Sequence, residues 1–63
     1  MNPYTRRYAV AIITLEDLRD TAEEIRIGGL VCPAYVWEGI RTQLWEAEIE
    51  VERAREALRK YRE

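Results

Sequence analysis

The second half of the chain carries an unbroken spacing of apolar positions. Between residues 33 and 62 they recur at alternating intervals of three and four, the heptad pattern of a helix that packs against another helix. These positions, called the heptad face below, are Trp37, Ile40, Leu44, Ala47, Val51, Ala54, Leu58 and Tyr61. The pattern predicts one continuous helix over residues 33–62. Proline suits the first position of a helix, so Pro33 is expected to begin it.

A shorter helix is predicted over residues 14–28. Thr14 is a suitable N-cap, and the apolar residues that follow it are again spaced by three, four and three. They are Leu15, Leu18, Ala22 and Ile25. Gly28 and Gly29 should end this helix, because glycine readily adopts the left-handed conformation found after a helix C-terminus. The short connection that follows predicts an antiparallel hairpin.

The first 13 residues are expected to form an extended arm or a short strand. The Asn2-Pro3 pair favours extended or turn geometry. Residues 8–13 are rich in β-branched and aromatic side chains, which favour strands. A lone strand cannot satisfy its own backbone, so this segment would pair with a second copy or lie along the helices.

The predicted helices differ in length, which leads to an expectation about assembly. A first helix of about 13 residues would cover less than half of a second helix of about 30. The heptad face beyond Val51 would then need another chain to cover it. A chain of 63 residues with one cysteine and no histidine cannot add an internal disulfide or an ordinary zinc site. We therefore expect a homo-oligomer, most simply a dimer, joined through the heptad face.

The composition offers few groups that perform chemistry. Without histidine or serine, the common pairs of nucleophile and base cannot be built within one chain. We expect no enzyme activity, no cofactor and no bound metal. Cys32 is expected to be a small buried hydrophobe, with a reactive thiol as the less favoured alternative.

The net charge of −2 does not suggest nucleic-acid binding by bulk electrostatics, and no apolar run approaches a membrane span. A soluble cytoplasmic protein is expected.

A second hypothesis comes from the N-terminal half. Arg6 and Arg7, flanked by tyrosines, could contact phosphates or an acidic partner. Residues 7–18, together with residues 29–41 and their segment AYVWEGIR, resemble the strand and two helices of the ribbon-helix-helix DNA-binding family. That resemblance implies a dimer whose paired strands enter the major groove, as in a transcription regulator or an antitoxin.

The leading expectation is a single mainly α domain over residues 1–63. It would be an antiparallel hairpin with a long heptad-patterned second helix, an N-terminal arm or strand, and a tendency to oligomerise. Its function would be protein-protein interaction, as a regulator, an inhibitor or a small subunit of an assembly. Its partners would be itself and another protein, with nucleic acid less favoured.

Overall fold

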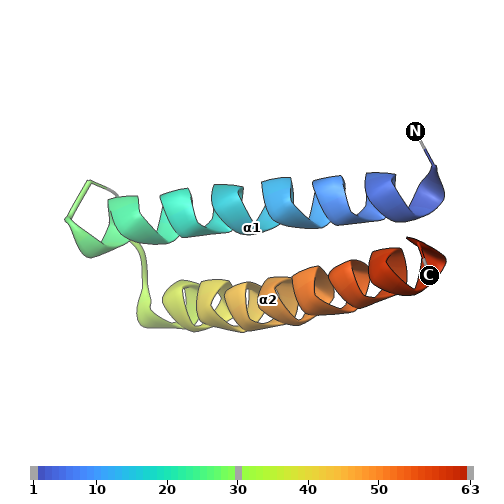
Figure 1. The fold of residues 1–63 in the computed structure, drawn as a ribbon. Helices are drawn as coiled ribbons and strands as arrows, with labels where there is room; N and C mark the ends of the chain where they lie inside the picture. The colour runs from blue at the N-terminus through green and yellow to red at the C-terminus, as the bar shows by residue number, and fades with distance from the viewer. Residues whose placement is uncertain (1, 30, 63) are drawn as a thin grey trace.

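Two long helices make up almost all of the chain. The computed structural model describes residues 2–29 and 31–62. Helix α1 spans Pro3–Arg26 and helix α2 spans Ala34–Arg62. They run side by side in opposite directions, so that both termini lie at the same end of a rod measuring 45 × 17 × 14 Å (Figure 1). The predicted antiparallel helical hairpin is confirmed.

The prediction of an N-terminal arm or strand is wrong, because residues 3–13 form the first half of α1. Asn2 is the N-cap, and its side-chain oxygen accepts a hydrogen bond from the Thr5 amide at 2.8 Å. Pro3 occupies the first helical turn, where its missing N–H and fixed φ carry no penalty. The Asn2-Pro3 pair is thus a helix start rather than part of an extended segment.

The apolar pattern of α1 also extends further toward the N-terminus than the prediction allowed. Tyr4, Tyr8 and Ala11 continue the spacing that starts at Leu15 and Leu18, with intervals of four, three, four and three. Ala11 is buried, and Tyr8 packs against the core. Packing against α2 therefore determines the conformation of residues 8–13 and overrides their β propensity.

Helix α1 ends as predicted, at the two glycines. Gly28 has a φ of +85°. Its amide donates to the carbonyl of Ile25 at 3.1 Å, and the Gly29 amide donates to the carbonyl of Glu24 at 2.8 Å. These two bonds form a Schellman motif, which satisfies carbonyls left open at a helix C-terminus. At the other end of the connection, the Pro33 carbonyl accepts from the Val36 and Trp37 amides, so Pro33 directly precedes α2.

Two glycine-to-alanine substitutions should change stability in opposite directions. Gly28→Ala places a Cβ on a residue with positive φ and should lower the free energy of unfolding by about 1 kcal/mol. Gly39→Ala lies inside α2, where an added Cβ meets nothing within 4 Å, and should raise it by roughly 0.5–1 kcal/mol. Urea unfolding of both variants provides the measurement, and equal effects would contradict the described turn.

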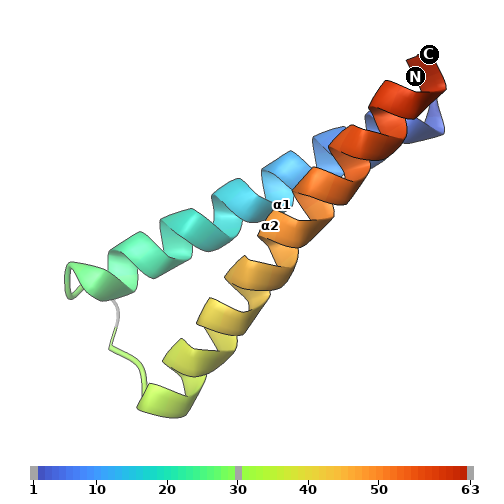
Figure 2. The same ribbon diagram turned by 60° about the horizontal axis from the view of Figure 1, so that its bottom comes forward.

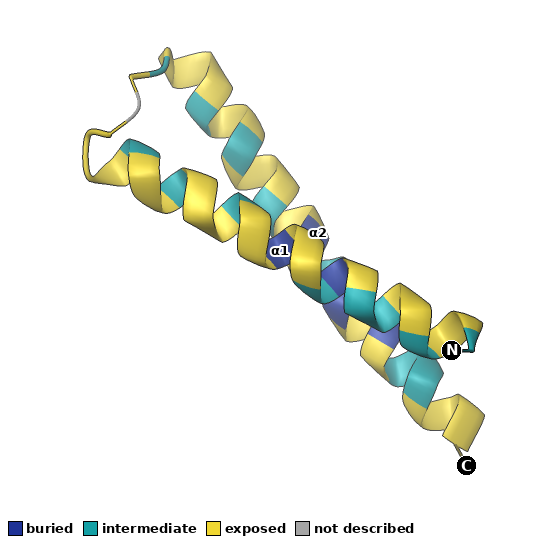
Figure 3. Cartoon of the chain, turned by 90° about the horizontal axis from the view of Figure 1, so that it is seen from above, coloured by how far each residue is buried: buried dark blue, intermediate teal, exposed yellow. Residues whose placement is uncertain are grey.

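The core lies where the two helices approach each other. They diverge toward the connection and overlap toward the termini (Figure 2). The buried residues gather where the helices overlap (Figure 3). They are Ala11, Leu15, Ala47, Val51 and Ala54. Three of the five are alanines, which allow close approach of the helices but bury little apolar surface.

The expected difference in helix length is also wrong. Helix α1 has 24 residues and α2 has 29. Helix α1 therefore covers the part of α2 that was expected to lack an intrachain partner. Val51 is 6% exposed and Ala54 is 0% exposed within a single chain. The uncovered second half of α2, from which the oligomer was inferred, does not exist in this structure.

Candidate interaction surfaces

The heptad face of α2 is turned toward α1. Three of its members are buried in the core and four more are partly buried. At its end, Tyr61 stacks on Tyr4 with ring centroids 4.8 Å apart and planes inclined by 25°. These residues were predicted to contact a second chain, and that contact stays a prediction. In the structure Ala47, Val51 and Ala54 are buried in the core shared with α1, and Leu44 packs against it. Most of the heptad face is therefore used within the chain, although Tyr61 remains 57% exposed.

A groove runs along one side of the pair of helices. It has a volume of ≈ 960 Å³. Its uncharged lining is Pro3, Val10, Ala11, Thr14, Leu18 and Thr21 from α1, with Gln43 and Ala47 from α2. Val10 lies in this lining with 55% of its surface exposed. The groove is thus a largely apolar strip along the pair of helices, and no other helix or strand of the described residues covers it.

Charged side chains stand along the borders of this groove. Arg7 of α1 and Glu50 of α2 form a two-pronged ion pair, with N···O distances of 2.7 and 2.9 Å. The hydrogen bonds from Arg7 lower the pKa of Glu50, and the same contact raises the pKa of Arg7. The pair remains charged at neutral pH and connects the helices across the groove.

Three further charges in the groove have no ion-pair partner among residues 2–29 and 31–62. They are Arg6, near the chain termini, and Asp17 and Glu46, both nearer the connection. A second ion pair between the helices, Arg19 with Glu48 at 3.7 Å, involves no residue of the groove lining.

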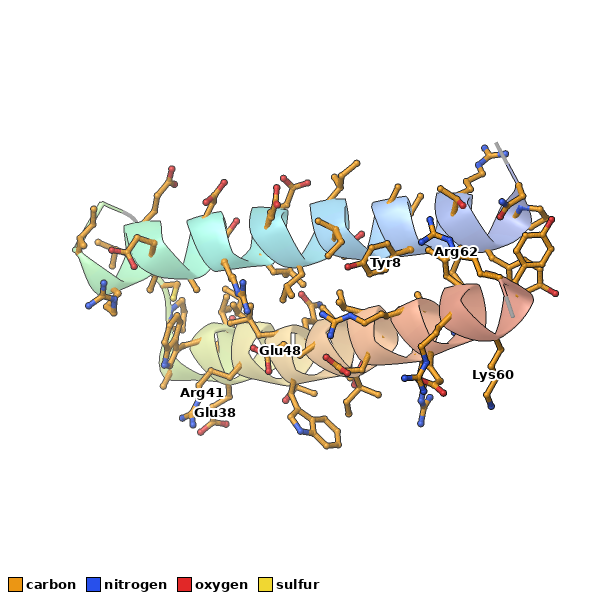
Figure 4. All side chains as sticks on the ribbon, viewed as in Figure 1. Tyr8, Glu38, Arg41, Glu48, Lys60 and Arg62 are labelled. Carbon is orange, nitrogen blue, oxygen red and sulfur yellow. The ribbon has the colours of Figure 1, made fainter. Side chains whose placement is uncertain are left out.

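The outer faces of the helices carry isolated apolar side chains. Ile13 on α1 is 58% exposed and Trp45 on α2 is 64% exposed. Trp45, Glu38, Arg41 and Thr42 line a shallow hollow of ≈ 660 Å³. Glu38, Arg41 and Lys60 point away from α1, whereas Tyr8 lies between the helices (Figure 4). This outer face of α2 is more polar and more open than the groove.

The predicted basic arm is part of α1. Arg6 is exposed along the groove, and Arg7 is engaged by Glu50. The strand on which the resemblance to the ribbon-helix-helix family depends is not formed, because residues 7–18 are helical. Sequence reasoning missed Val10 and Asp17 as surface residues of one groove. The four-three spacing through Tyr4, Tyr8 and Ala11 was the signal that could have placed them on a helix.

Three further observations concern the cysteine, metal binding and membrane insertion. Cys32 is a free thiol and is partly buried in the connection. No group of three or more histidine, cysteine, aspartate or glutamate side chains within residues 2–29 and 31–62 could hold a metal ion. Neither helix formed by the described residues combines the length and hydrophobicity needed to cross a membrane.

Comparison with known proteins gives no family for this chain. No protein-family model matches the sequence, and neither the curated proteins nor the solved structures include a significant match. The functional argument therefore rests on the geometry and chemistry of the helices themselves.

Proposed function

We propose that this chain is a small non-enzymatic helical protein that acts by binding other protein chains, beginning with a second copy of itself. The observation that carries this proposal is the exposed surface of the hairpin. Its accessible area is 5061 Å². A compact monomer of 7.5 kDa would expose roughly 4,200 Å² by the usual scaling of area with mass. The surplus of roughly 800 Å² follows from the rod shape of the hairpin, which leaves both helices open along their length, and it is similar to one partner's share of a standard protein interface.

The small core supports the same proposal. Two long helices gain most of their stability from tertiary packing rather than from helix propensity. Here that packing rests on Leu15, Val51 and three alanines, with no large side chain fully buried among the described residues. Small domains with so little buried apolar surface usually need a disulfide, a metal or association. Association is the form of stabilisation that this chain's composition favours.

A hairpin that completes its packing within a complex suits three related roles. It could regulate a protein partner, inhibit one, or serve as a small subunit of a larger assembly. All three depend on apolar surface that is open in the single chain, represented by Val10, Ile13 and Trp45. Of these, Val10 belongs to the largely apolar groove, and a continuous apolar strip is typical of an interaction surface.

The proposal is tested by the mass of the protein in solution. Sedimentation equilibrium across the micromolar range should give a mass that rises from 7.5 kDa toward at least twice that value. Far-UV circular dichroism of the same samples should show helicity increasing with concentration, because association stabilises the folded chain by mass action. A fully helical protein of 7.5 kDa throughout this range would contradict self-association.

A further inference from the structure

We propose that the groove between α1 and α2 receives the same groove of a second copy, with the two α1 helices antiparallel across a two-fold axis near Val10 and Thr14. This inference rests on the proposed self-association and specifies its surface and geometry. It also replaces the heptad face as the predicted contact between chains. The arrangement is a bundle of four helices in which each hairpin supplies two.

The centre of the groove is suited to such a contact. On α1, Val10 and Thr14 lie one turn apart and are both exposed, while Ala11 beside them is buried. Antiparallel pairing about an axis between them places Val10 opposite Thr14 of the second copy. The lining extends from Pro3 to Thr21 on α1, a length of roughly 27 Å. A groove of that length is long enough for a contact of about 800 Å² per chain, the usual share of one partner in a protein interface.

The charges of the groove are self-complementary in this orientation. Arg6 and Asp17 lie on either side of the apolar centre, and neither pairs with a charged side chain among the described residues. When the two α1 helices pack antiparallel about this axis, Arg6 of each copy lies close to Asp17 of the other copy. The two-fold symmetry makes this contact twice.

Helix α2 contributes two acids to the groove, Glu46 and Glu50, and both lie nearer the connection than the C-terminus. Glu50 is held by Arg7 of its own chain. The basic residues near the end of α2, such as Lys60, lie outside the groove lining. The charge complementarity of the proposed contact therefore rests on α1.

The other face-to-face orientation is disfavoured by the same charges. A two-fold axis parallel to the helices would place α1 against α2 of the second copy. Asp17 would then lie level with the acidic segment that contains Glu46, and Arg6 level with the basic segment that contains Lys60. Like charges brought together in an interface reduce affinity, so electrostatics selects the orientation with α1 against α1.

A charge exchange tests the inference. Arg6→Glu and Asp17→Arg, each alone, place like charges together twice per dimer and should weaken self-association about tenfold or more. The double variant carrying both substitutions restores opposite charges and should recover the wild-type dissociation constant to within about threefold. Sedimentation equilibrium gives the constants, and circular dichroism at the same concentrations checks helicity.

Matched controls are available on the outer faces. Arg41→Glu and Asp20→Arg make the same charge reversals outside the groove lining and should leave the dissociation constant unchanged. A wild-type dimer that is unaffected by both groove variants would overturn this surface while leaving the proposed function standing. Weakening by the single variants without recovery in the double variant would overturn the antiparallel orientation. A monomeric wild type would overturn both proposals.

Discussion

Replacing Val51 with aspartate is expected to unfold the helical hairpin. Val51 is 6% exposed and belongs to the same buried cluster as Leu15 and Ala54. The substitution removes about 1.5–3 kcal/mol of apolar burial and adds the cost of desolvating a carboxylate. A helix pair with so small a core cannot retain its fold after that loss. Far-UV circular dichroism at micromolar concentration should show loss of most of the helical signal.

Val10→Asp is the matched control for this prediction. It makes the same chemical change at a position with 55% of its surface exposed within the chain. The Val10→Asp protein should retain more helicity than the Val51→Asp protein at every concentration, while associating less than the wild type. If Val51→Asp instead remains fully helical and only loses mass, the heptad face contacts another chain, as the sequence first suggested, and the described packing is wrong.

The hairpin and its connection could be predicted because their signals are local. The three-four spacing of α2 needs no knowledge of the partner helix. Glycine ends a helix because it readily adopts the left-handed conformation that follows a helix C-terminus, and Gly28 has the positive φ of that conformation. These features depend on neighbours a few residues away, which a sequence shows directly.

The N-terminal half of α1 was harder to predict because two local signals conflict there. Residues 8–13 contain the β-branched residues typical of a strand, yet Tyr8 and Ala11 also fit the helical spacing. The conflict is resolved by contacts with α2, including the stacking of Tyr4 on Tyr61. Once this segment is helical, the two helices nearly match in length and the first argument for an oligomer disappears.

The groove could not be predicted, because its existence depends on the register of one helix against the other. Arg7 and Glu50 are 43 residues apart in sequence, and only the folded hairpin brings them within 2.7 Å. The same register places Val10 of α1 and Ala47 of α2 in the lining of one groove. Small size and composition led to the expectation of a partner, while the groove proposed to bind one is visible only in the tertiary structure.

The second large effect is expected from Ala54→Leu, which should destabilise the hairpin by overpacking. Ala54 is 0% exposed and lies where the helices overlap, in a cluster that includes Ala11 and Leu15. Extra methyl groups at such a position force the helices apart or force side chains off their rotamers, at a cost of about 1–3 kcal/mol. For a domain of this size, that cost corresponds to a melting temperature lower by roughly 5–20 °C. Thermal unfolding followed by circular dichroism, at one fixed concentration, measures it.

Two further variants determine whether close helix packing is the cause. Ala34→Leu makes the same change at an exposed residue in the first turn of α2 and should shift the melting temperature little. Leu15→Ala combined with Ala54→Leu returns volume to the same cluster and should be more stable than the sum of the single effects implies. If the two substitutions change the stability strictly additively, Leu15 and Ala54 are not in contact. An Ala54→Leu protein as stable as the wild type would mean that the helices do not meet closely at this residue, because only a close contact makes the size of its side chain decisive.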